Sequence, residues 1–200
     1  MDVRIRGLLL CGGRATRFGS DKLLAPIEVA GVRAPVAAHA ARHLIGGVGS
    51  ALAVLPLGAS DLRAALLGAG CEILETDRTA LGMGASLAAA VAASDRAEGW
   101  IVALGDMPLV AAATVRAVRA ALEEGALIAA PVLSRTGVRG HPVGFAAELR
   151  AELLALQGDA GARSILDRHR ARLRILATDD AGILVDLDTP EQLEALRRAR

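Results

Sequence analysis

The chain has 200 residues, of which 53% are hydrophobic and 2% aromatic, and its formal net charge is +1 at pH 7. This length is typical of one domain with a sizeable core, and the balance of charge argues against a nucleic-acid-binding surface, which needs a basic excess on one face. The chain also has one Trp, two Phe and no Tyr, so the aromatic side chains on which single-stranded bases stack are nearly absent.

Short apolar runs alternate with segments of helical periodicity along the whole chain. Strands are predicted at residues 3–10, 51–55, 71–74, 100–104, 127–132, 172–176 and 183–187, with an antiparallel strand at 142–145. Helices are predicted at residues 35–45, 61–67, 83–94, 114–123, 147–156 and 161–169, and a closing helix from residue 190. This alternation predicts an α/β fold, with a Rossmann-like, mostly parallel sheet flanked by helices in a single domain that spans residues 1–200.

Lysine is nearly absent from the chain. Of the 23 basic residues all but one are arginine, and Lys22 is the only lysine. A general drift from Lys to Arg accounts for this imbalance. Under that drift, a position that keeps lysine is a candidate for a function that requires a lysine side chain. The alternative is that Lys22 has remained a lysine by chance.

The first strand ends in a glycine-rich loop. Residues 8–26 read LLLCGGRATRFGSDKLLAP, and ligands of open parallel sheets bind beyond the carboxyl ends of the strands. Glycines let backbone N–H groups approach an anion, and nearby Arg17 and Lys22 would neutralise it, so the loop is a candidate polyphosphate cradle. Its spacing fits neither the P-loop nor the dinucleotide-binding fingerprint. An ordinary glycine-rich turn with solvated arginines is the alternative.

A carboxylate follows the strand in WIVALGDMP, residues 100–108. A lone carboxylate at the end of a buried strand is costly unless it is paired or binds a metal, which makes Asp106 a candidate Mg²⁺ ligand. The alternative is that Asp106 caps the following turn.

Two further carboxylates lie in ILVDLDTPEQL, residues 183–193. Alternation puts Asp186 and Asp188 on one face of an extended segment, where two like charges favour a cation between them. The alternative is that Asp188 or Thr189 caps the helix that follows.

Six segments together resemble the nucleotidyltransferases of molybdenum cofactor maturation, most closely the molybdenum cofactor cytidylyltransferases. They are the loop at residues 10–22, GMGASL at 82–87, LGDMP at 104–108, GHPVGF at 140–145, GDAGAR at 158–163 and DLDTPEQL at 186–193. The resemblance covers nearly the whole chain. It implies a fold of the nucleotidyltransferase type and transfer of a nucleotidyl group from a nucleoside triphosphate to the terminal phosphate of the molybdopterin cofactor, with release of pyrophosphate.

The resemblance also implies roles for individual residues. Lys22, Arg17 and Asp106 would be catalytic, with Lys22 stabilising the charge that develops at the transferred phosphorus. Mg²⁺ would bind Asp106 and Asp188, or Asp188 would face the substrate instead. The other nucleotide- and cofactor-binding residues would be Leu10, Cys11, Gly12, Gly13 and Gly19 in the first loop, Gly82, Gly84 and Ser86 beside the base and ribose, and Gly140, His141 and Pro142 on the pterin side.

The motifs differ in whether they favour CTP or GTP as the substrate. Cytidylyl enzymes of this family usually read L-A-A-G in the first loop and guanylyl enzymes L-A-G-G, so Gly12 in LCGG is guanylyl-like. The two-residue gap between Gly19 and Lys22, GMGASL, LGDMP and the aspartates of DLDTP all follow the cytidylyl pattern. These features outnumber the exception and favour CTP, with GTP as the alternative.

Other functions stay open. The acceptor could be another phosphate, such as a sugar phosphate, because the fold does not fix the acceptor. A non-enzyme alternative is a maturation partner that binds the cofactor and delivers it to a molybdoenzyme apoprotein, which is also a candidate partner of the enzyme. The intact Lys22 and Asp106 disfavour a carrier without activity. A dinucleotide-dependent oxidoreductase would need a glycine spacing that the chain lacks.

Several remaining features are interpreted as structural. His39 and His43 lack the Glu of a zinc motif and are assigned to a solvated face, as are the arginines at 163, 168, 170, 172 and 174. Cys11 and Cys71 give no disulfide framework, and no window reaches the ~18 apolar residues of a membrane span. We therefore expect a soluble, cytoplasmic protein with neither nucleic acid nor a membrane as partner.

Overall fold

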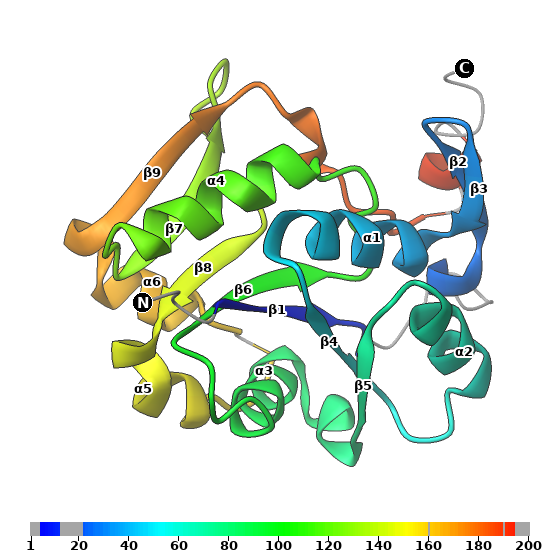
Figure 1. Cartoon of the computed structure of the whole chain (residues 1–200), viewed down its shortest axis with the longest axis horizontal. Coiled ribbons are helices and arrows are strands. Elements are labelled where there is room, and N and C mark those ends of the chain that lie inside the picture. Colours follow the sequence, from blue (N-terminus) through cyan, green and yellow to red (C-terminus); the bar gives the residue numbers. More distant parts are fainter. Residues whose placement is uncertain (1–4, 13–21, 160, 190, 195–200) are drawn as a thin grey trace.

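The computed structural model describes residues 5–12, 22–159, 161–189 and 191–194 (Figure 1). Seven strands form one sheet in the order β5-β4-β1-β6-β8-β7-β9, and β8 alone runs antiparallel to its neighbours. The strands are β1 (Ile5–Leu10), β4 (Ala51–Leu55), β5 (Glu72–Glu75), β6 (Gly99–Leu104), β7 (Ile128–Leu133), β8 (Val143–Ala146) and β9 (Leu173–Thr178). The predicted α/β fold with a mostly parallel sheet is confirmed, including its antiparallel strand.

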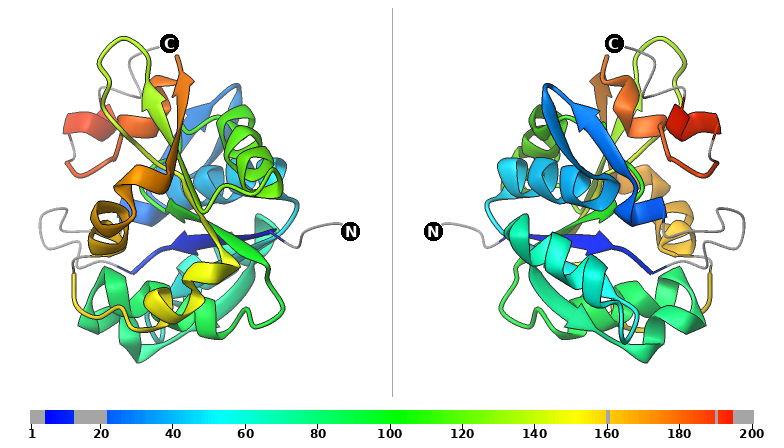
Figure 2. Two further views of the ribbon diagram at one scale, coloured as in Figure 1. Left: turned by 90° about the vertical axis from the view of Figure 1, so that its left-hand side faces the viewer. Right: turned by 90° about the vertical axis from the view of Figure 1, so that its right-hand side faces the viewer.

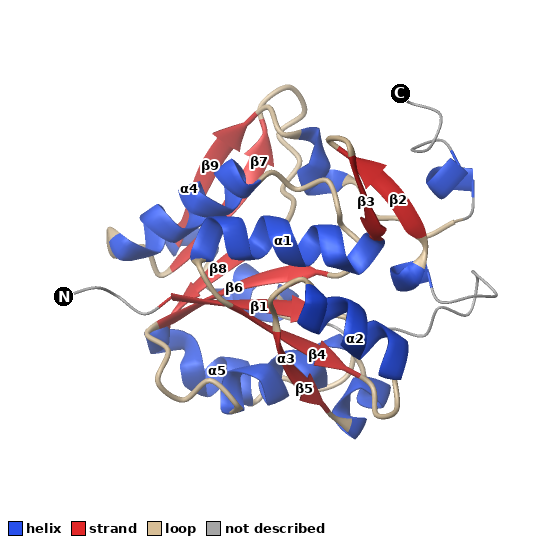
Figure 3. Cartoon of the chain, turned by 45° about the vertical axis from the view of Figure 1, so that its right-hand side comes forward, coloured by secondary structure: helices blue, strands red, loops and turns tan. Residues whose placement is uncertain are grey.

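Helices cover both faces of this sheet. They are α1 (Val36–Val48), α2 (Ser60–Gly68), α3 (Met83–Ala92), α4 (Ala112–Glu123), α5 (Arg150–Leu154) and α6 (Arg163–Arg168), with short 3₁₀ turns η1 (Lys22–Leu24), η2 (Asp77–Leu81), η3 (Ala147–Leu149), η4 (Arg170–Arg172) and η5 (Ala181–Leu184). Figure 3 shows α1, α2 and α4 on one face and α3 and α5 on the other, and the side views of Figure 2 show the sheet between these layers. Among the described helices, none has the length and apolarity needed to cross a bilayer.

The alternation of side chains along the central strands builds two cores. Leu9 on β1 packs with α1, α2 and α4, whereas Leu8 and Leu10 pack with α3, α5 and α6. All three are at most 5% exposed. The apolar run of the first strand therefore reflects burial on both faces, which is typical of a parallel sheet.

The apolar face of α1 includes a histidine. His39 is 3% exposed, and its Nε2 lies 3.3 Å from the carbonyl oxygen of Ile27. The prediction of a solvated face is therefore wrong for His39, because this side of α1 packs beneath the hairpin of β2 (Pro26–Val29) and β3 (Val32–Pro35). Burial lowers the pKa of His39 despite this hydrogen bond.

The predicted strand at residues 183–187 is wrong. Asp180 accepts a hydrogen bond from the Gly182 N–H at 2.9 Å, and the chain turns there into η5 instead of continuing as a strand. The other carboxylate oxygen of Asp180 accepts from the Ala111 N–H and the Thr114 hydroxyl at the start of α4. A local bond from side chain to backbone has thus outcompeted sheet pairing, and it ties this segment to α4.

A small satellite core holds the C-terminal segment against the hairpin. Ile27 of β2 and Val36 pack with Leu187 and Leu193, and Figure 1 shows the two segments side by side. Residues 191–194 are helical, whereas Pro190, where the closing helix was expected to begin, lies outside the described residues.

Candidate active site

The carboxyl ends of β1 and β6 lie next to each other. The two strands are parallel neighbours, with Leu10 paired to Leu104, and the Gly105 N–H donates to the Leu10 carbonyl at 2.9 Å. A side chain at Gly105 would approach Cys11 Sγ to 2.7 Å, so glycine permits this close contact. The loop that begins after Leu10 therefore starts beside Asp106, as expected for a ligand-binding edge.

The segment that carries Asp188 is anchored to the same edge. The Leu187 N–H donates to the carbonyl oxygen of Asp106 at 3.0 Å, and the Leu187 side chain is 2% exposed. Asp186 and Asp188 on either side of it are exposed, so the predicted alternation is present although the segment is not a strand. Thr189 and Gln192 form a reciprocal cap at the start of the helical residues 191–194, which leaves the Asp188 carboxylate outside the cap.

Lys22, Asp106 and Asp188 meet at this point. Lys22 Nζ lies 2.8 Å from Asp106 Oδ2 and 2.6 Å from Asp188 Oδ1, although the three residues are far apart in the sequence. The second oxygen of Asp106, Oδ1, is buried and has no hydrogen-bond partner. The sequence predicts a cation between Asp186 and Asp188, whereas the cation in this structure, the ammonium group of Lys22, lies between Asp106 and Asp188.

The charges around Lys22 favour its protonated form. Partial burial by itself lowers the pKa of Lys22, but the hydrogen bonds and charges of Asp106 and Asp188 outweigh it and raise that pKa above its ordinary value. The pKa of Asp186 is also raised, because partial desolvation of this otherwise exposed side chain and the neighbouring charge of Asp188 disfavour its ionised form. The site is therefore rich in negative charge, with one firmly charged ammonium at its centre.

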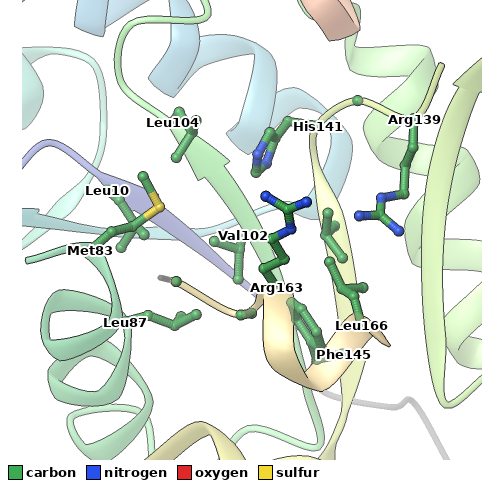
Figure 4. A pocket seen from close by; sticks show the side chains of 14 residues that line it. Leu10, Met83, Leu87, Val102, Leu104, Arg139, His141, Phe145, Arg163 and Leu166 are labelled. Atoms are coloured by element: carbon green, nitrogen blue, oxygen red, sulfur yellow. The ribbon is translucent and has the colours of Figure 1, made fainter. Parts of the chain in front are cut away.

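A cavity of about 310 Å³ opens on the α3 and α6 side of the strand ends. Its lining combines apolar side chains, including Leu10, with His141 and two arginines, Arg139 and Arg163. Figure 4 shows the two arginines across the cavity from Leu10 and Met83. Neither guanidinium forms an ion pair with a carboxylate of the described residues. Apolar walls and two guanidiniums that pair with no described carboxylate suit a molecule that combines a ring system with an anionic group.

Gly140 and His141 line this cavity, and His141 is also close enough to Asp106 and Asp186 to be influenced by their charges. A side chain at Gly140 would overlap the Ile183 carbonyl, and the His141 N–H donates to that carbonyl at 3.0 Å. The His141–Pro142 peptide bond is cis. Burial lowers the pKa of His141, although a backbone hydrogen bond with Val102 and the charges of nearby carboxylates oppose the shift. The shift favours the neutral form of His141, and its Nδ1 is buried without a hydrogen-bond partner.

Gly12 is packed against the segment before α3. A Cβ at Gly12 would lie 2.8 Å from both Cβ and Cγ2 of Thr79 and 3.3 Å from Ser86 Oγ. Thr79 is held by its hydroxyl, which donates to the Thr76 carbonyl at 3.1 Å. Ser86 is fully buried, and its hydroxyl donates to the Gly82 carbonyl at 3.0 Å. Thr79 thus fills the space that a side chain at position 12 would occupy.

Gly82 and Gly84 have a structural reason to be glycine. A side chain at Gly82, where φ is 109°, would overlap Asp159 and the backbone of Gly158. The Gly84 N–H donates to the Gly158 carbonyl at 2.7 Å, which leaves no room for a Cβ. Contact of either glycine with a base or ribose stays a prediction. Of the first loop, Gly13, Arg17 and Gly19 lie outside the described residues.

Comparison with known proteins identifies this arrangement. A family model described as a MobA-like NTP transferase domain matches residues 7–173, which is most of the chain. The chain belongs to the MobA-like NTP transferase family. Its fold and its family are those of nucleotidyltransferases.

Relatives of this MobA-like domain carry different names. A protein of Paenarthrobacter nicotinovorans named nicotine blue oxidoreductase is 30% identical over 198 residues, which cover 96% of each chain. The purine catabolism protein PucB of Bacillus subtilis is 31% identical over 121 residues, 59% of this chain and 57% of PucB. The crystal structure of Rv0371c from Mycobacterium tuberculosis has a TM-score of 0.82 at 29% identity and covers 98% of both chains. A second structure of Rv0371c, in complex with manganese, has a TM-score of 0.78 at 26% identity and covers 99% of this chain and 100% of Rv0371c.

The residues of this MobA-like domain fit a divalent metal in part. Asp106 offers a buried carboxylate oxygen without a partner, and Asp188 offers an exposed carboxylate beside it. Within the described residues, no group of three or more His, Cys, Asp or Glu is arranged to hold a metal ion. Two carboxylates suffice for Mg²⁺ when substrate phosphates supply further oxygens. Both predicted metal ligands are therefore suitable in chemistry and position for a metal that arrives with phosphates.

Three side chains of this region were missed or misinterpreted from the sequence. Arg163 was assigned to a solvated arginine face, but it lines the cavity although it is exposed. Its signal was present, since it ends the GDAGAR motif. Arg139 directly precedes GHPVGF and could have been included with it. Asp180 gave no signal, because its role depends on the start of α4, far away in the sequence.

Proposed function

We propose that this MobA-like domain, spanning residues 1–200, transfers CMP from CTP to the terminal phosphate of molybdopterin and releases pyrophosphate. The observation that carries the proposal is the contact of Lys22 with both Asp106 and Asp188, at a strand end bordered by an arginine-lined cavity. A nucleotidyl transfer needs positioned phosphates and neutralised charge and requires no covalent enzyme intermediate. These residues are suited to both needs.

In the proposed reaction, an oxygen of the acceptor's terminal phosphate forms a bond to the α-phosphorus of CTP. The bond from that phosphorus to the oxygen shared with the β-phosphate breaks, and pyrophosphate leaves with the electron pair. Lys22 would stabilise the negative charge that develops on the phosphates, together with Arg17 and the backbone of Gly13 and Gly19. Mg²⁺, held by Asp106 and Asp188, would supply further neutralisation of phosphate charge.

The cavity is the proposed site of the acceptor. Its apolar walls would pack against the pterin, and Arg139 and Arg163 would face anionic groups of the acceptor. His141 lines this cavity and is also influenced by the charge of Asp106, which supports a place for the α-phosphorus near the cavity. A molybdoenzyme apoprotein that receives the product is a further proposed partner.

CTP is proposed over GTP on the balance of the motifs, and the contact at Gly12 supports this choice. Gly12 is the one guanylyl-like feature of the sequence. Because Thr79 lies where a Cβ at position 12 would be, the glycine opens no extra space for a larger base.

The direct test is pyrophosphate release with molybdopterin, Mg²⁺ and each of CTP, GTP, ATP and UTP. We expect release with CTP alone. Release with GTP alone would reverse the nucleotide assignment while keeping the reaction class. If none of the four nucleotides gives pyrophosphate release and molybdopterin still binds, the carrier function or another acceptor such as a sugar phosphate would be favoured.

A second candidate function comes from the relative named nicotine blue oxidoreductase, which aligns over 96% of the chain. Its test is loss of the nicotine blue colour in the presence of NADH or NADPH. The nucleotidyl-transfer account expects no colour loss above the rate without protein. If the protein removes the colour in this assay and releases no pyrophosphate in the other, oxidoreductase activity would replace nucleotidyl transfer as the proposed function.

A further inference from the structure

The cation between Asp106 and Asp188 is a side chain of the protein itself. Lys22 Nζ is within hydrogen-bond distance of one oxygen of each carboxylate, at 2.8 and 2.6 Å. Its side chain is 15% exposed, so solvent screens these ion pairs only in part. Lys22 thereby pairs with both carboxylates that would hold a metal.

Lys22 has a second task that conflicts with this one. In the proposed reaction, the ammonium contacts the phosphates of the nucleotide, and a single ammonium group cannot neutralise two carboxylates and a triphosphate at once. If Lys22 turns to the phosphates, Asp106 and Asp188 lose their shared counter-charge and repel each other, with Asp186 adding to the repulsion. If a metal displaces Lys22 before the nucleotide binds, a partly buried ammonium is left without a partner, which is costly.

We propose that Lys22 keeps the metal site closed until a nucleoside triphosphate binds. The phosphates attract the ammonium away from Asp106 and Asp188, and the two carboxylates then accept a divalent cation in its place. Metal and nucleotide therefore bind cooperatively, and each raises the affinity for the other by the same factor. The inference rests on the proposed function only in requiring a nucleoside triphosphate as substrate.

The first test measures Mn²⁺ binding without nucleotide, by electron paramagnetic resonance of the free ion. The variant Lys22→Met keeps the length of the side chain and removes its charge. We expect Lys22→Met to bind Mn²⁺ at least about tenfold more tightly than the parent chain, within the usual range of coupling between sites. Unchanged or weaker binding by a variant with the parent's circular dichroism and melting temperature would overturn the proposal.

The matched control is Arg139→Met, which also removes one positive charge from this edge of the sheet. Arg139 borders the cavity and makes no ion pair with either carboxylate. We expect its Mn²⁺ affinity to stay within about twofold of the parent's, because only a general field effect is lost. An equal gain in Mn²⁺ affinity in both variants would show that only the net charge matters and not the position of Lys22, and it would overturn the proposal.

The second test observes Lys22 directly. Because Lys22 is the only lysine, protein labelled with [¹³Cε]lysine gives a single lysine side-chain resonance. We expect Mg²⁺ alone to leave this resonance in place and Mg²⁺ with α,β-methylene-CTP to shift it. A shift of the same size with Mg²⁺ alone would contradict a closed site.

Neither test contains an acceptor, so their outcomes are independent of the transfer reaction. Cooperative binding without pyrophosphate release from molybdopterin would keep this inference and remove the proposed acceptor. Pyrophosphate release by the parent chain, combined with no gain in Mn²⁺ affinity in Lys22→Met, would keep the proposed function and remove this inference. The analogue of GTP replaces that of CTP if the pyrophosphate assay assigns GTP.

Discussion

Lys22 combines two properties that arginine cannot supply together. Its compact ammonium fits between Asp106 Oδ2 and Asp188 Oδ1, and its flexible stem would let it reach the phosphates. We predict that Lys22→Arg keeps the charge and the fold but lowers kcat at least about 100-fold, because the planar guanidinium displaces the phosphates from an in-line path. Steady-state pyrophosphate release measures this. Turnover by Lys22→Arg equal to the parent's would show that the reaction does not require lysine at position 22.

Asp106 is predicted to act on the reaction and not on the fold. Asp106→Asn removes the charge that Lys22 and a metal share, and we expect kcat to fall by at least about 100-fold with an unchanged melting temperature. The matched control is Asp95→Asn, an exposed carboxylate before β6, at the opposite end of the strand from Asp106. Retained turnover in Asp106→Asn would remove this residue from the metal role.

The close approach of Gly12 to Thr79 predicts that a substitution at position 12 can be compensated by a second substitution at position 79. A Cβ at position 12 would come within 2.8 Å of Thr79, so we expect Gly12→Ala to shift the loop and weaken CTP binding at least about tenfold. Adding Thr79→Gly removes both atoms in the way and should restore most of the affinity. Titration calorimetry of the single and double variants measures this. Binding by Gly12→Ala equal to the parent's would show that the two segments separate easily.

At the scale of elements, adjacent glycines of α1 differ in what they face. A methyl group at Gly47 would overlap Val115 of α4, which is 1% exposed, whereas one at Gly46 would make an ordinary contact of 3.4 Å with Ala112. We predict that Gly47→Ala destabilises the protein by about 1–3 kcal/mol through overpacking. Gly46→Ala should be neutral or stabilising by up to about 1 kcal/mol, because alanine is the better helix former. Urea unfolding of both variants tests this pair, and equal effects would contradict a tight contact between α1 and α4.

The elements that sequence periodicity predicted well are those whose pattern reflects burial. The strand at 51–55 is reproduced at both ends, because each of its residues is buried in one of the two cores. The segment 183–187 is also apolar apart from Asp186, yet it is anchored through Asp180 and Leu187 to α4 and Asp106 instead of to another strand. Periodicity indicates which side chains are buried, but it does not indicate what covers them.

The same distinction applies to the site. The approach of Asp106 to the loop after β1 could be predicted, because the carboxyl ends of neighbouring parallel strands meet at one edge of the sheet. Asp188 reaches the same point from a segment that is not a strand, so its contact with Lys22 is known only from the structure. Periodicity could not place Arg139 and Arg163 at the cavity, because an exposed arginine has the same local pattern whether it faces solvent or a cavity. Their only signal was their position beside GHPVGF and at the end of GDAGAR. The competition between Lys22 and a metal for the same oxygens also follows only from the three-dimensional contacts.

At the scale of the whole molecule, stability should fall at alkaline pH through one buried thiol. Burial raises the pKa of Cys71 to about 11, so the unfolded chain loses this proton first as the pH rises, and the folded state is disfavoured above the unfolded pKa of about 8.5–9. We predict a loss of about 2 kcal/mol in the free energy of unfolding between about pH 8 and pH 10.5.

The second cysteine, Cys11, is also buried and is common to the parent and to the Cys71→Ala control, so the difference between these two proteins isolates Cys71. The chain has no tyrosine, and its single lysine has a raised pKa, so the stabilising charge of Lys22 is kept over the same range. Cys71→Ala is the control, since it lowers stability at every pH through the lost packing but should lose less with rising pH than the parent. Equal pH slopes for the parent and Cys71→Ala in urea unfolding would contradict the assignment.

The family and the fold together establish the class of the domain, while the acceptor and the nucleotide depend on the site. The most direct test of the account follows a label from the nucleotide to the acceptor. With molybdopterin, Mg²⁺ and CTP labelled at the α-phosphate, the account predicts label in a dinucleotide form of the cofactor. With CTP labelled at the γ-phosphate, it predicts label in pyrophosphate only. Label from the γ-phosphate on the acceptor, or none on the acceptor from either position, would contradict nucleotidyl transfer from CTP to molybdopterin.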